Sequence, residues 1–378
     1  MSKEPIANIE KHFVDLPDPR TGNATQHIFL EILVIAICAV ICGADGWTDV
    51  ELFGRKKKKW LKTFLELPKG IPSHDTFGRV FAKIKPEEFQ KRFMEWVKAI
   101  ETLTHGQVIA VDGKQLRGSH DHEQGKSAIY MVNAWATANQ LVLGQRKVDE
   151  KSNEITAIPK LLQVLEISGC IVTIDAIGTQ TEIAKTIIQK DGDYLLSVKE
   201  NQGRLFSDIQ FLFETDARYA FEQVAHSYAK TVNKDHGRIE VRECWAIDHE
   251  EYLNQLYGRE NWMGLKCIVR IVSRRQIGDK VEHKIRYFIS SLPANAKTIL
   301  KAKRDHWKIE NQVHWVLDIA FREDNSRVRI DHAAENLSVL RHMALNLLKK
   351  EKTAKGGIRA KRLQAAWDQD YLLTVLKG

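Results

Sequence analysis

The chain has 378 residues, of which 43% are hydrophobic and 28% are charged. A chain of this length and composition can bury at least one sizeable core, so it is not a disordered or low-complexity protein, and its length predicts two or three domains. Lysine and arginine number 57 against 49 acidic residues, and the formal net charge of +8 favours a polyanionic partner.

The five cysteines follow neither a disulfide pattern nor a zinc pattern. Their number is odd, no CxxC occurs, and no histidine spacing matches a structural zinc site, which favours a reducing cytoplasm. The longest apolar run, residues 32–42, is shorter than the roughly 18–20 residues that a bilayer crossing needs. It also begins too deep in the chain for a secretory signal. We therefore expect a core helix there and no membrane partner.

Residues 1–100 predict a separate helical N-terminal domain. An apolar helix is expected over 25–42, and Ser73 and Pro86 each stand where a further helix would begin. These last two helices resemble a helix-turn-helix, which fits a DNA-binding domain and an ordinary packing domain equally well. The basic run 55–59 is either a solvated helix face or a phosphate-contacting patch.

The rest of the chain mixes strand and helix patterns. Over 105–220 the order is strand, strand, strand, helix, strand, helix, strand, which predicts an α/β fold with a mixed sheet covered by helices. Residues 221–293 are rich in β-branched and aromatic residues and predict an inserted β-strand subdomain. Helical patterns return over 294–352, including a long helix over 302–321, and a basic tail with one short helix occupies 353–378.

Two aspartates, Asp112 and Asp175, follow β-branched runs ("VIAVD" and "IVTID") that predict buried strands, and each is expected at the carboxyl end of its strand. An acid there is costly to bury unless it is paired, hydrogen-bonded or metal-bound. Open α/β sheets bind ligands at this edge. One such aspartate would be explained as a cap or turn residue, whereas two on one sheet favour a functional site.

A third acid is expected on the long helix near the end of the chain. Glu310 shares a helix face with His314 and Asp318, and Trp307 and Trp315 indicate a packed face. Three other acids are rivals for this role: Asp318, Glu323 and Asp324. Three converging carboxylates suit Mg²⁺ or Mn²⁺, and two such ions about 3.5–4 Å apart promote in-line displacement at a phosphodiester.

A polyanion held against an acidic site needs basic and polar contacts around it. We expect DNA-binding residues at these positions: Lys114, Arg117, Lys199, Asn201, Arg204, Arg238 and His314. For each basic residue, an ordinary surface charge is the alternative. Other catalytic patterns are weaker, because "GSH" lacks the full nucleophile-elbow pattern and no phosphate-binding glycine loop is present.

Several long motifs of the chain form a familiar set. They are "VIAVDGKQLRGS", "IVTIDAIGTQ", "YLLSVKENQ", "HGRIEVR" and "HWKIENQVHWVLDIAFREDNSR", preceded by "LPDPR" and "GIPSHDTFGRVF". The first five resemble the H-repeat-associated group of bacterial insertion-sequence DDE transposases, and the last two resemble its associated N-terminal domain. The resemblance spans essentially the whole chain. It implies a ribonuclease H-like fold with a helical N-terminal domain and a β-strand insertion before the last acid.

The resemblance also implies a chemistry. Asp112, Asp175 and Glu310 match the three acids of the family and would be both catalytic and metal-binding, with two Mg²⁺ or Mn²⁺ ions per site. The implied reaction is hydrolysis of a phosphodiester at the element ends, followed by strand transfer into target DNA. The implied partners are double-stranded DNA, as terminal inverted repeats and as target, and a second protomer in a dimer on that DNA, in the bacterial cytoplasm.

One position departs from the broader relatives, which carry a lysine seven residues beyond the last acid. Here that residue is Leu317, and the basic contact would come from Lys308 or Arg322, or be absent. Two other functions stay open. One is a DNA nuclease that cuts without integrating, and the other is a non-catalytic relic or repressor that occupies DNA ends.

Overall fold

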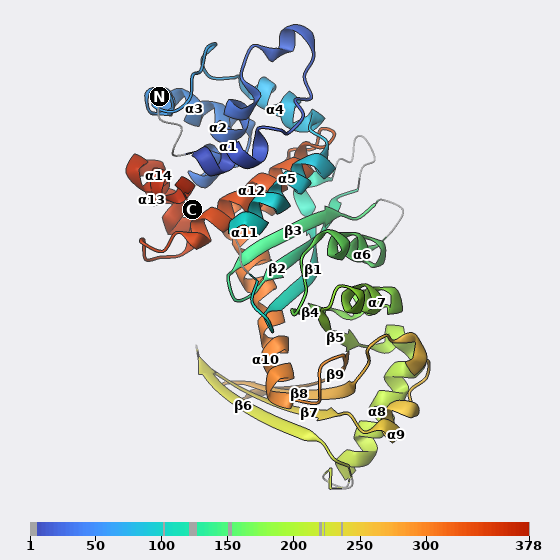
Figure 1. Cartoon of the computed structure of the whole chain (residues 1–378). Coiled ribbons are helices and arrows are strands. Elements are labelled where there is room, and N and C mark those ends of the chain that lie inside the picture. Colours follow the sequence, from blue (N-terminus) through green and yellow to red (C-terminus); the bar gives the residue numbers. More distant parts are fainter. Residues whose placement is uncertain are drawn as a thin grey trace.

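The computed structural model describes residues 6–100, 103–120, 127–149, 153–218, 221–222, 224–235 and 237–377. Figure 1 shows a group of helices at one end, a central sheet flanked by helices, and a sheet extension at the other end. Among these residues, no helix combines the length and the apolar composition that crossing a membrane requires. All five cysteines are free thiols, and four of them are buried.

The N-terminal region is helical, as the sequence predicts. Its helices are α1 (Ala7–Phe13), α2 (Phe29–Ile41), α3 (Trp47–Leu61), α4 (His74–Lys83) and α5 (Pro86–Ile100). The hydroxyl of Ser73 accepts a hydrogen bond from the Thr76 N–H at 3.3 Å and caps α4. Pro86 is the first residue of α5. Both predicted helix starts are therefore confirmed.

These helices share their core with the end of the chain. Apart from Glu31, helix α2 is apolar on every side and is buried along almost its whole length, and it packs against α12 (Ala333–Lys350), which is buried as far as Lys349. A single cluster of buried apolar residues extends from Ile6 to Leu376. The N-terminal helices therefore share packing contacts with the end of the chain.

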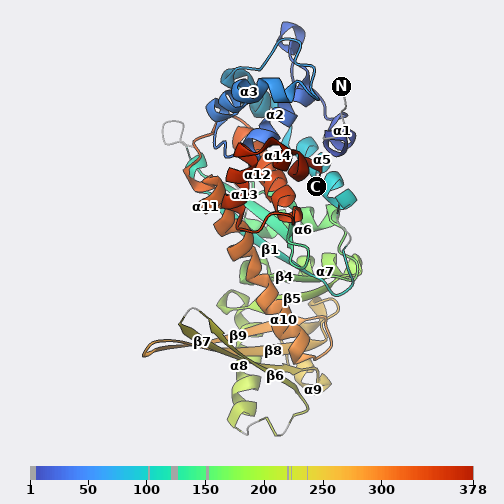
Figure 2. The ribbon, with the colours of Figure 1, turned by 90° about the vertical axis from the view of Figure 1, so that its left-hand side faces the viewer.

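The central sheet has the strand order β3-β2-β1-β4-β5. The first three of these strands are antiparallel, and β4 and β5 run parallel to β1. Helices α6 and α7 cover one face, and α10 crosses the other (Figures 1 and 2), so the predicted mixed sheet covered by helices is confirmed. The elements are β1 (Val108–Leu116), β2 (Ile129–Ala136), β3 (Leu141–Lys147), α6 (Glu154–Val164), β4 (Ile171–Ile174), α7 (Thr181–Gln189) and β5 (Asp193–Val198).

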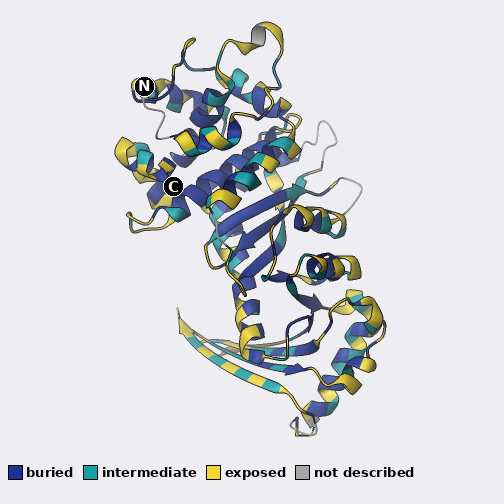
Figure 3. Cartoon of the chain, viewed as in Figure 1, coloured by how far each residue is buried: buried dark blue, intermediate teal, exposed yellow. Residues whose placement is uncertain are grey.

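Residues 221–293 continue this sheet. Strand β9 (Lys280–Ser290) pairs with β5, and β8 (Cys267–Ile277), β7 (Arg238–Ile247) and β6 (Ser227–Asp235) follow in turn, so the nine strands of the described chain form one sheet. Exposed and partly exposed residues alternate along the outermost strand, β6 (Figure 3). The sequence misses two elements of this part, β6 and α9 (Glu250–Asn254), and also α8 (Gly203–Arg218), which precedes it.

A nearly continuous helical run crosses the sheet before α12. It consists of α10 (Ala296–His306), a π-helical turn (Glu310–His314) and α11 (Trp315–Phe321). It begins six residues earlier than the predicted helix over 302–321. After α12 the chain forms two helices, α13 (Ile358–Trp367) and α14 (Gln369–Lys377), where the sequence predicts one.

The outer edge of β3 is satisfied by a side chain. Asn346 of α12 accepts a hydrogen bond from the Val142 N–H and donates one to the Val142 carbonyl, both at 2.9 Å. Both residues are fully buried. The amide therefore replaces the strand partner that an edge strand lacks, and it fixes α12 to the sheet.

We expect Asn346→Leu to lower the free energy of unfolding by about 2 kcal/mol, because the buried N–H and carbonyl of Val142 would lose their partners. Urea-induced unfolding followed by circular dichroism measures this change. The same substitution at the exposed Asn261 should stay within about 0.5 kcal/mol. Equal losses at the two positions would contradict the assigned role of Asn346.

A carboxyl group buried between α5 and α12 makes stability depend on pH. Glu335 is 7% exposed, and its Oε1 accepts a hydrogen bond from Gln90 Nε2 at 3.1 Å. Burial raises the pKa of Glu335 from 4.5 to about 7. The folded state therefore holds a proton that the unfolded chain releases at lower pH, so stability is lost as the pH rises from about 4.5 to about 7.

Replacing the Glu335 carboxyl with a neutral amide should remove the loss of stability at higher pH. We expect Glu335→Gln to be more stable than the wild type at pH 8, by up to about 3 kcal/mol, and close to it at pH 4.5. Thermal unfolding of both proteins at the two pH values measures the difference. A stability difference that is the same at both values would show that the ionisation of Glu335 is not its cause.

Candidate active site

The register of the sheet brings the two predicted aspartates together. Strands β1 and β4 run parallel with Val111 opposite Ile174, so Asp112 and Asp175 occupy the next equivalent positions. Strand β4 ends there, and its neighbours β1 and β5 both continue beyond it. The prediction that its strand ends at Asp112 is wrong, because β2 keeps pairing with β1 as far as Leu116.

Asp175 is held by two residues of α10. Its Oδ1 lies 3.3 Å from His306 Nε2 and 3.9 Å from Lys303 Nζ, and His306 Nδ1 lies 2.9 Å from the Thr173 hydroxyl. The hydrogen bond from His306, together with these nearby charges, holds the pKa of Asp175 well below its usual range. Asp175 is thus ionised and oriented while 55% of its side chain is exposed.

Glu310 lies on the π turn that follows α10. Such turns insert an extra residue into a helix and are frequent at functional sites. His314 Nδ1 lies 3.1 Å from Glu310 Oε2 and 3.7 Å from Asp112 Oδ2. The hydrogen bond with His314 lowers the pKa of Glu310. Burial raises the pKa of Asp112, although the charges of His314 and His306 oppose this rise.

Asp112, Glu310 and His314 form a candidate metal site. Each offers one ligand atom such that all three atoms lie within 4.8 Å of one another. Carboxylate oxygens suit Mg²⁺ and Mn²⁺, and an imidazole nitrogen suits transition ions better than Mg²⁺. Opposite Asp112 on β2, the amide oxygen of Asn133 is buried and has no hydrogen-bond partner among the described residues. A water or ion beside Asp112 would satisfy it.

The three rival acids surround a lysine instead of joining this site. Lys114 Nζ lies 2.6 Å from Asp318, 3.2 Å from Asp324 and 3.8 Å from Glu323. Lys114 follows Asp112 by two residues on β1 and so points to the same face, where α11 and the loop after it pack. The side chains of Lys114 and Glu323 are 7% and 1% exposed. Lys114, an expected DNA contact, is therefore engaged in internal ion pairs.

Three of the expected DNA contacts lie near the candidate site. Arg117 is 78% exposed, with its Nε 3.5 Å from Asp324. Lys199 is exposed directly after β5, and its charge helps to lower the pKa of Asp175. Asn201 donates a hydrogen bond to the Ala176 carbonyl at 2.9 Å, which ties the loop after β5 to the loop after β4.

The remaining expected contacts are placed differently. The Arg204 guanidinium on α8 stacks over the Tyr257 ring at 4.6 Å. Arg238 begins β7, four strands away from β4 in the sheet. His314 is 4% exposed and stands among the acids. The structure thus brings His314 into the site and leaves Arg204 and Arg238 outside it.

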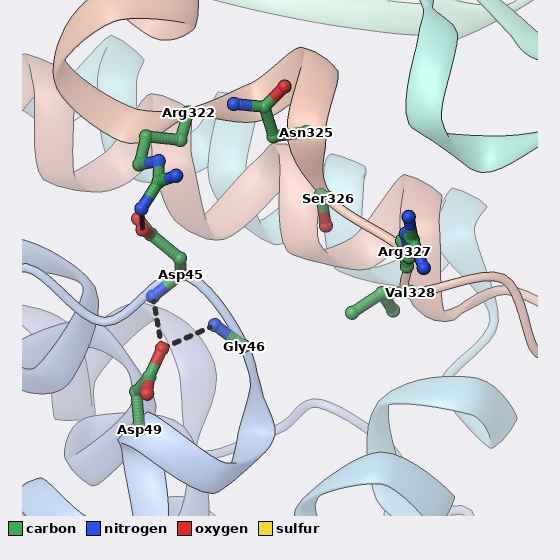
Figure 4. Close-up of a pocket in the computed structure, with 8 residues that line it drawn as sticks. All are labelled: Asp45, Gly46, Asp49, Arg322, Asn325, Ser326, Arg327 and Val328. Atoms are coloured by element: carbon green, nitrogen blue, oxygen red, sulfur yellow. Dashed lines mark hydrogen bonds and ion pairs between the residues drawn. The ribbon is translucent and has the colours of Figure 1, made fainter.

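The helix position where broader relatives carry a lysine is occupied by Leu317, which is fully buried. Of the two possible substitutes, Lys308 has its Nζ 2.6 Å from Asp305. Arg322 lies 3.8 Å from Asp45 and lines a cavity of about 460 Å³ between the start of α3 and the loop after α11 (Figure 4). Both side chains are paired with carboxylates other than Glu310.

Sequence reasoning does not single out His306 and Lys303, the residues that hold Asp175. A pattern that could have found His306 is its spacing, because His306, Glu310 and His314 recur every four residues. Lys303 carries no comparable pattern. Its role depends on how α10 crosses the sheet, which the sequence does not show.

Substitutions of Lys114 and Arg117 compare the contribution of a buried cation to stability with that of a surface cation. We expect Lys114→Ala to lower the free energy of unfolding by about 3–5 kcal/mol, because it removes the buried cation that Asp318, Glu323 and Asp324 share. Arg117→Ala should change it by less than about 0.5 kcal/mol and should weaken DNA binding instead. Urea unfolding and DNA gel-shift titration separate the two effects. A Lys114→Ala protein of wild-type stability would contradict the internal role.

Two family models match the chain, and several known proteins are similar to it. The family model described as "DDE_Tnp_1-associated" matches residues 10–97, and the model described as "Transposase DDE domain" matches residues 104–347. The chain is 39% identical to "H repeat-associated putative transposase YhhI" of Escherichia coli (strain K12), over 99% of this chain and 98% of the relative. It is 41% identical to "Putative transposase YncI" of Escherichia coli O157:H7, over 96% of this chain and 92% of the relative.

A solved structure of a piggyBac transposase synaptic complex with hairpin DNA aligns with 96% of this chain and 76% of the piggyBac chain, at 10% identity and a TM-score of 0.40.

Proposed function

Because the chain belongs to the H-repeat-associated group of DDE transposases and is thus an insertion-sequence transposase, we propose that Asp112, Asp175 and Glu310 catalyse cleavage of DNA at the element ends. The freed 3′-hydroxyl then attacks target DNA. The observation that carries this proposal is the register of β1 and β4, which sets the two aspartates side by side with Glu310 facing Asp112 across His314.

The order of the central strands supports a ribonuclease H-like catalytic core. Three antiparallel strands are followed by two that run parallel to the first, in the spatial order β3-β2-β1-β4-β5, and helices cover both faces. In this arrangement the core comprises residues 105–220 and 294–352, and the extension over 221–293 is inserted between them. The insertion therefore precedes the Glu310 helix.

The donor set fits hard divalent cations such as Mg²⁺ or Mn²⁺. Asp112 and Glu310 would hold one ion beside His314, which stays hydrogen-bonded to Glu310, and Asp112 and Asp175 would contribute to a second. Bound divalent ions would lower the pKa of a water nucleophile and stabilise the leaving oxygen. Asp112, between the other acids, is the residue common to both positions.

The surrounding residues prepare the acids for this role. His306 keeps Asp175 deprotonated and fixes the direction of its carboxylate through a hydrogen bond that is itself anchored at Thr173. Lys303 places a positive charge at 3.9 Å from the same carboxylate. His314 fixes Glu310 in the same way on the other side of Asp112. The acids are thus held for metal binding before DNA arrives.

Double-stranded DNA is the substrate in this proposal, both as terminal inverted repeats and as target. The exposed basic residues of α3 over 55–59 and the exposed Arg117 and Lys199 near the acids provide phosphate contacts. The N-terminal helices would recognise the repeats. Joining two ends to one target requires two active sites, so we propose a dimer on the DNA.

Cleavage of a labelled duplex that carries the end of the gene's own element tests the proposal. We expect product only with Mg²⁺ or Mn²⁺, and a loss greater than about 10²-fold in Asp112→Asn and in Glu310→Gln, since metal stabilisation of several kcal/mol is removed. The rival-site variant Asp324→Asn serves as the control and should keep cleaving. Full activity in Asp112→Asn would refute the assignment.

Two further outcomes separate the alternative functions. A paired-end integration assay distinguishes a transposase from a nuclease that cuts without joining. If the wild type binds element ends but forms no product with either metal, a non-catalytic DNA-binding relic replaces the proposal.

A further inference from the structure

One carboxylate near the aspartates takes no part in the proposed triad. Glu154 is the first residue of α6, which covers the sheet face opposite α10. Gly113, directly after Asp112 on β1, points toward this face, since successive strand residues alternate. The edge of β1 beyond Val111 has no β4 partner. Groups from both faces can therefore reach the two aspartates at this edge.

The side chain of Glu154 lies directly over Gly113. A Cβ atom at position 113 would stand 2.4 Å from Glu154 Oε1 and 2.7 Å from the Tyr130 hydroxyl. Both distances are too short for any real side chain, so only glycine allows the carboxylate and the phenol to approach the strand this closely. Gly113 thus gives Glu154 its place beside Asp112.

Glu154 differs from the triad in its partners. Asp112, Asp175 and Glu310 each lie within 4 Å of a histidine nitrogen, whereas no ion pair joins Glu154 to a cation among the described residues. The Tyr130 hydroxyl donates to its carboxylate. Burial raises the pKa of Glu154, and the charges of Asp112 and Asp175 raise it further. A cation bound between these three acids would offset that repulsion.

A second observation, on the face of the sheet that Asp112 occupies, points to a ligand beside Asp112. The buried amide oxygen of Asn133, opposite Asp112, has no protein partner among the described residues. Asn133 is 2% exposed, and leaving such an oxygen unpaired is costly unless a water or ion satisfies it. The surroundings of Asp112 therefore have unused oxygen donors in addition to the triad.

We propose that Glu154 is a fourth carboxylate of the active site and that it holds the second divalent cation together with Asp112 and Asp175. This proposal rests on the proposed function. Glu310 serves the first ion from the α10 side, and Glu154 serves the second from the α6 side. Asp112 lies between them. The two ions thus differ in their protein ligands and can be removed separately.

Mn²⁺ binding to the full-length protein tests this assignment without relying on activity. Electron paramagnetic resonance titration counts the bound ions in the wild type, Glu154→Gln, and the control Glu182→Gln, a change of an exposed acid on α7. We expect two ions in the wild type and the control. We expect Glu154→Gln to bind one of the two ions at least about 10-fold more weakly, one lost ligand being worth 1.4 kcal/mol or more. Two ions bound with unchanged affinity in Glu154→Gln would overturn the proposal.

Gly113→Ala provides an independent variant that keeps every carboxylate. Its Cβ displaces Glu154 and Tyr130, so it should weaken the same ion as Glu154→Gln, whereas Glu310→Gln should weaken the other one. Thermal unfolding confirms that each variant is folded. If Gly113→Ala folds and binds both ions as the wild type does, Glu154 is not a ligand. A wild type that binds no Mn²⁺ and cuts no DNA would instead refute the proposed function.

Discussion

The site depends on how negative charge is offset at one edge of the sheet. Three carboxylates come together there, and each one is set against a cation or an imidazole supplied by the helical run that crosses the sheet. Because uncompensated acids repel one another and resist burial, the position of this run decides whether the site can form. A second group of acids, around Lys114, obeys the same constraint separately. The two groups have different direct partners, and the charge of Lys114 also helps to lower the pKa of Glu310.

Helix α12 holds these parts in place. It is buried throughout, yet it carries polar side chains, and several of them satisfy a neighbouring element. Asn346 completes the edge of β3, Asn336 donates to the carbonyls of Phe81 and Ile84 at the end of α4, and Arg341 lies 3.6 Å from Glu323 beside the Lys114 cluster. One buried helix thus connects the N-terminal helices, the sheet and the loop after α11. Such polar contacts specify a unique packing, because a shifted helix would leave buried groups unpaired.

Local patterns in the sequence predict the elements well, and non-local pairing explains what they miss. The two aspartates are 63 residues apart in the sequence, and the parallel register of β1 and β4 has this same offset. The β-branched run before each aspartate was therefore enough to predict that the two side chains lie close together. The polar, alternating β6 gave no hydrophobic pattern, and its place depends on β7. The π turn, the role of His306 and the burial of Lys114 all arise from how α10 and α11 cross the sheet. No periodicity within a helix contains that information.

The continuous sheet has a mechanical consequence. Strand β5 contacts the aspartate strand β4 on one side and the extension strand β9 on the other, and α10 packs on both the central strands and the outer strands β6 and β7. A load applied at the tip of the extension therefore reaches the acids along two rigid paths, through the sheet and through the helix that carries His306. Bending or twisting the extension would therefore change the distances between the carboxylates.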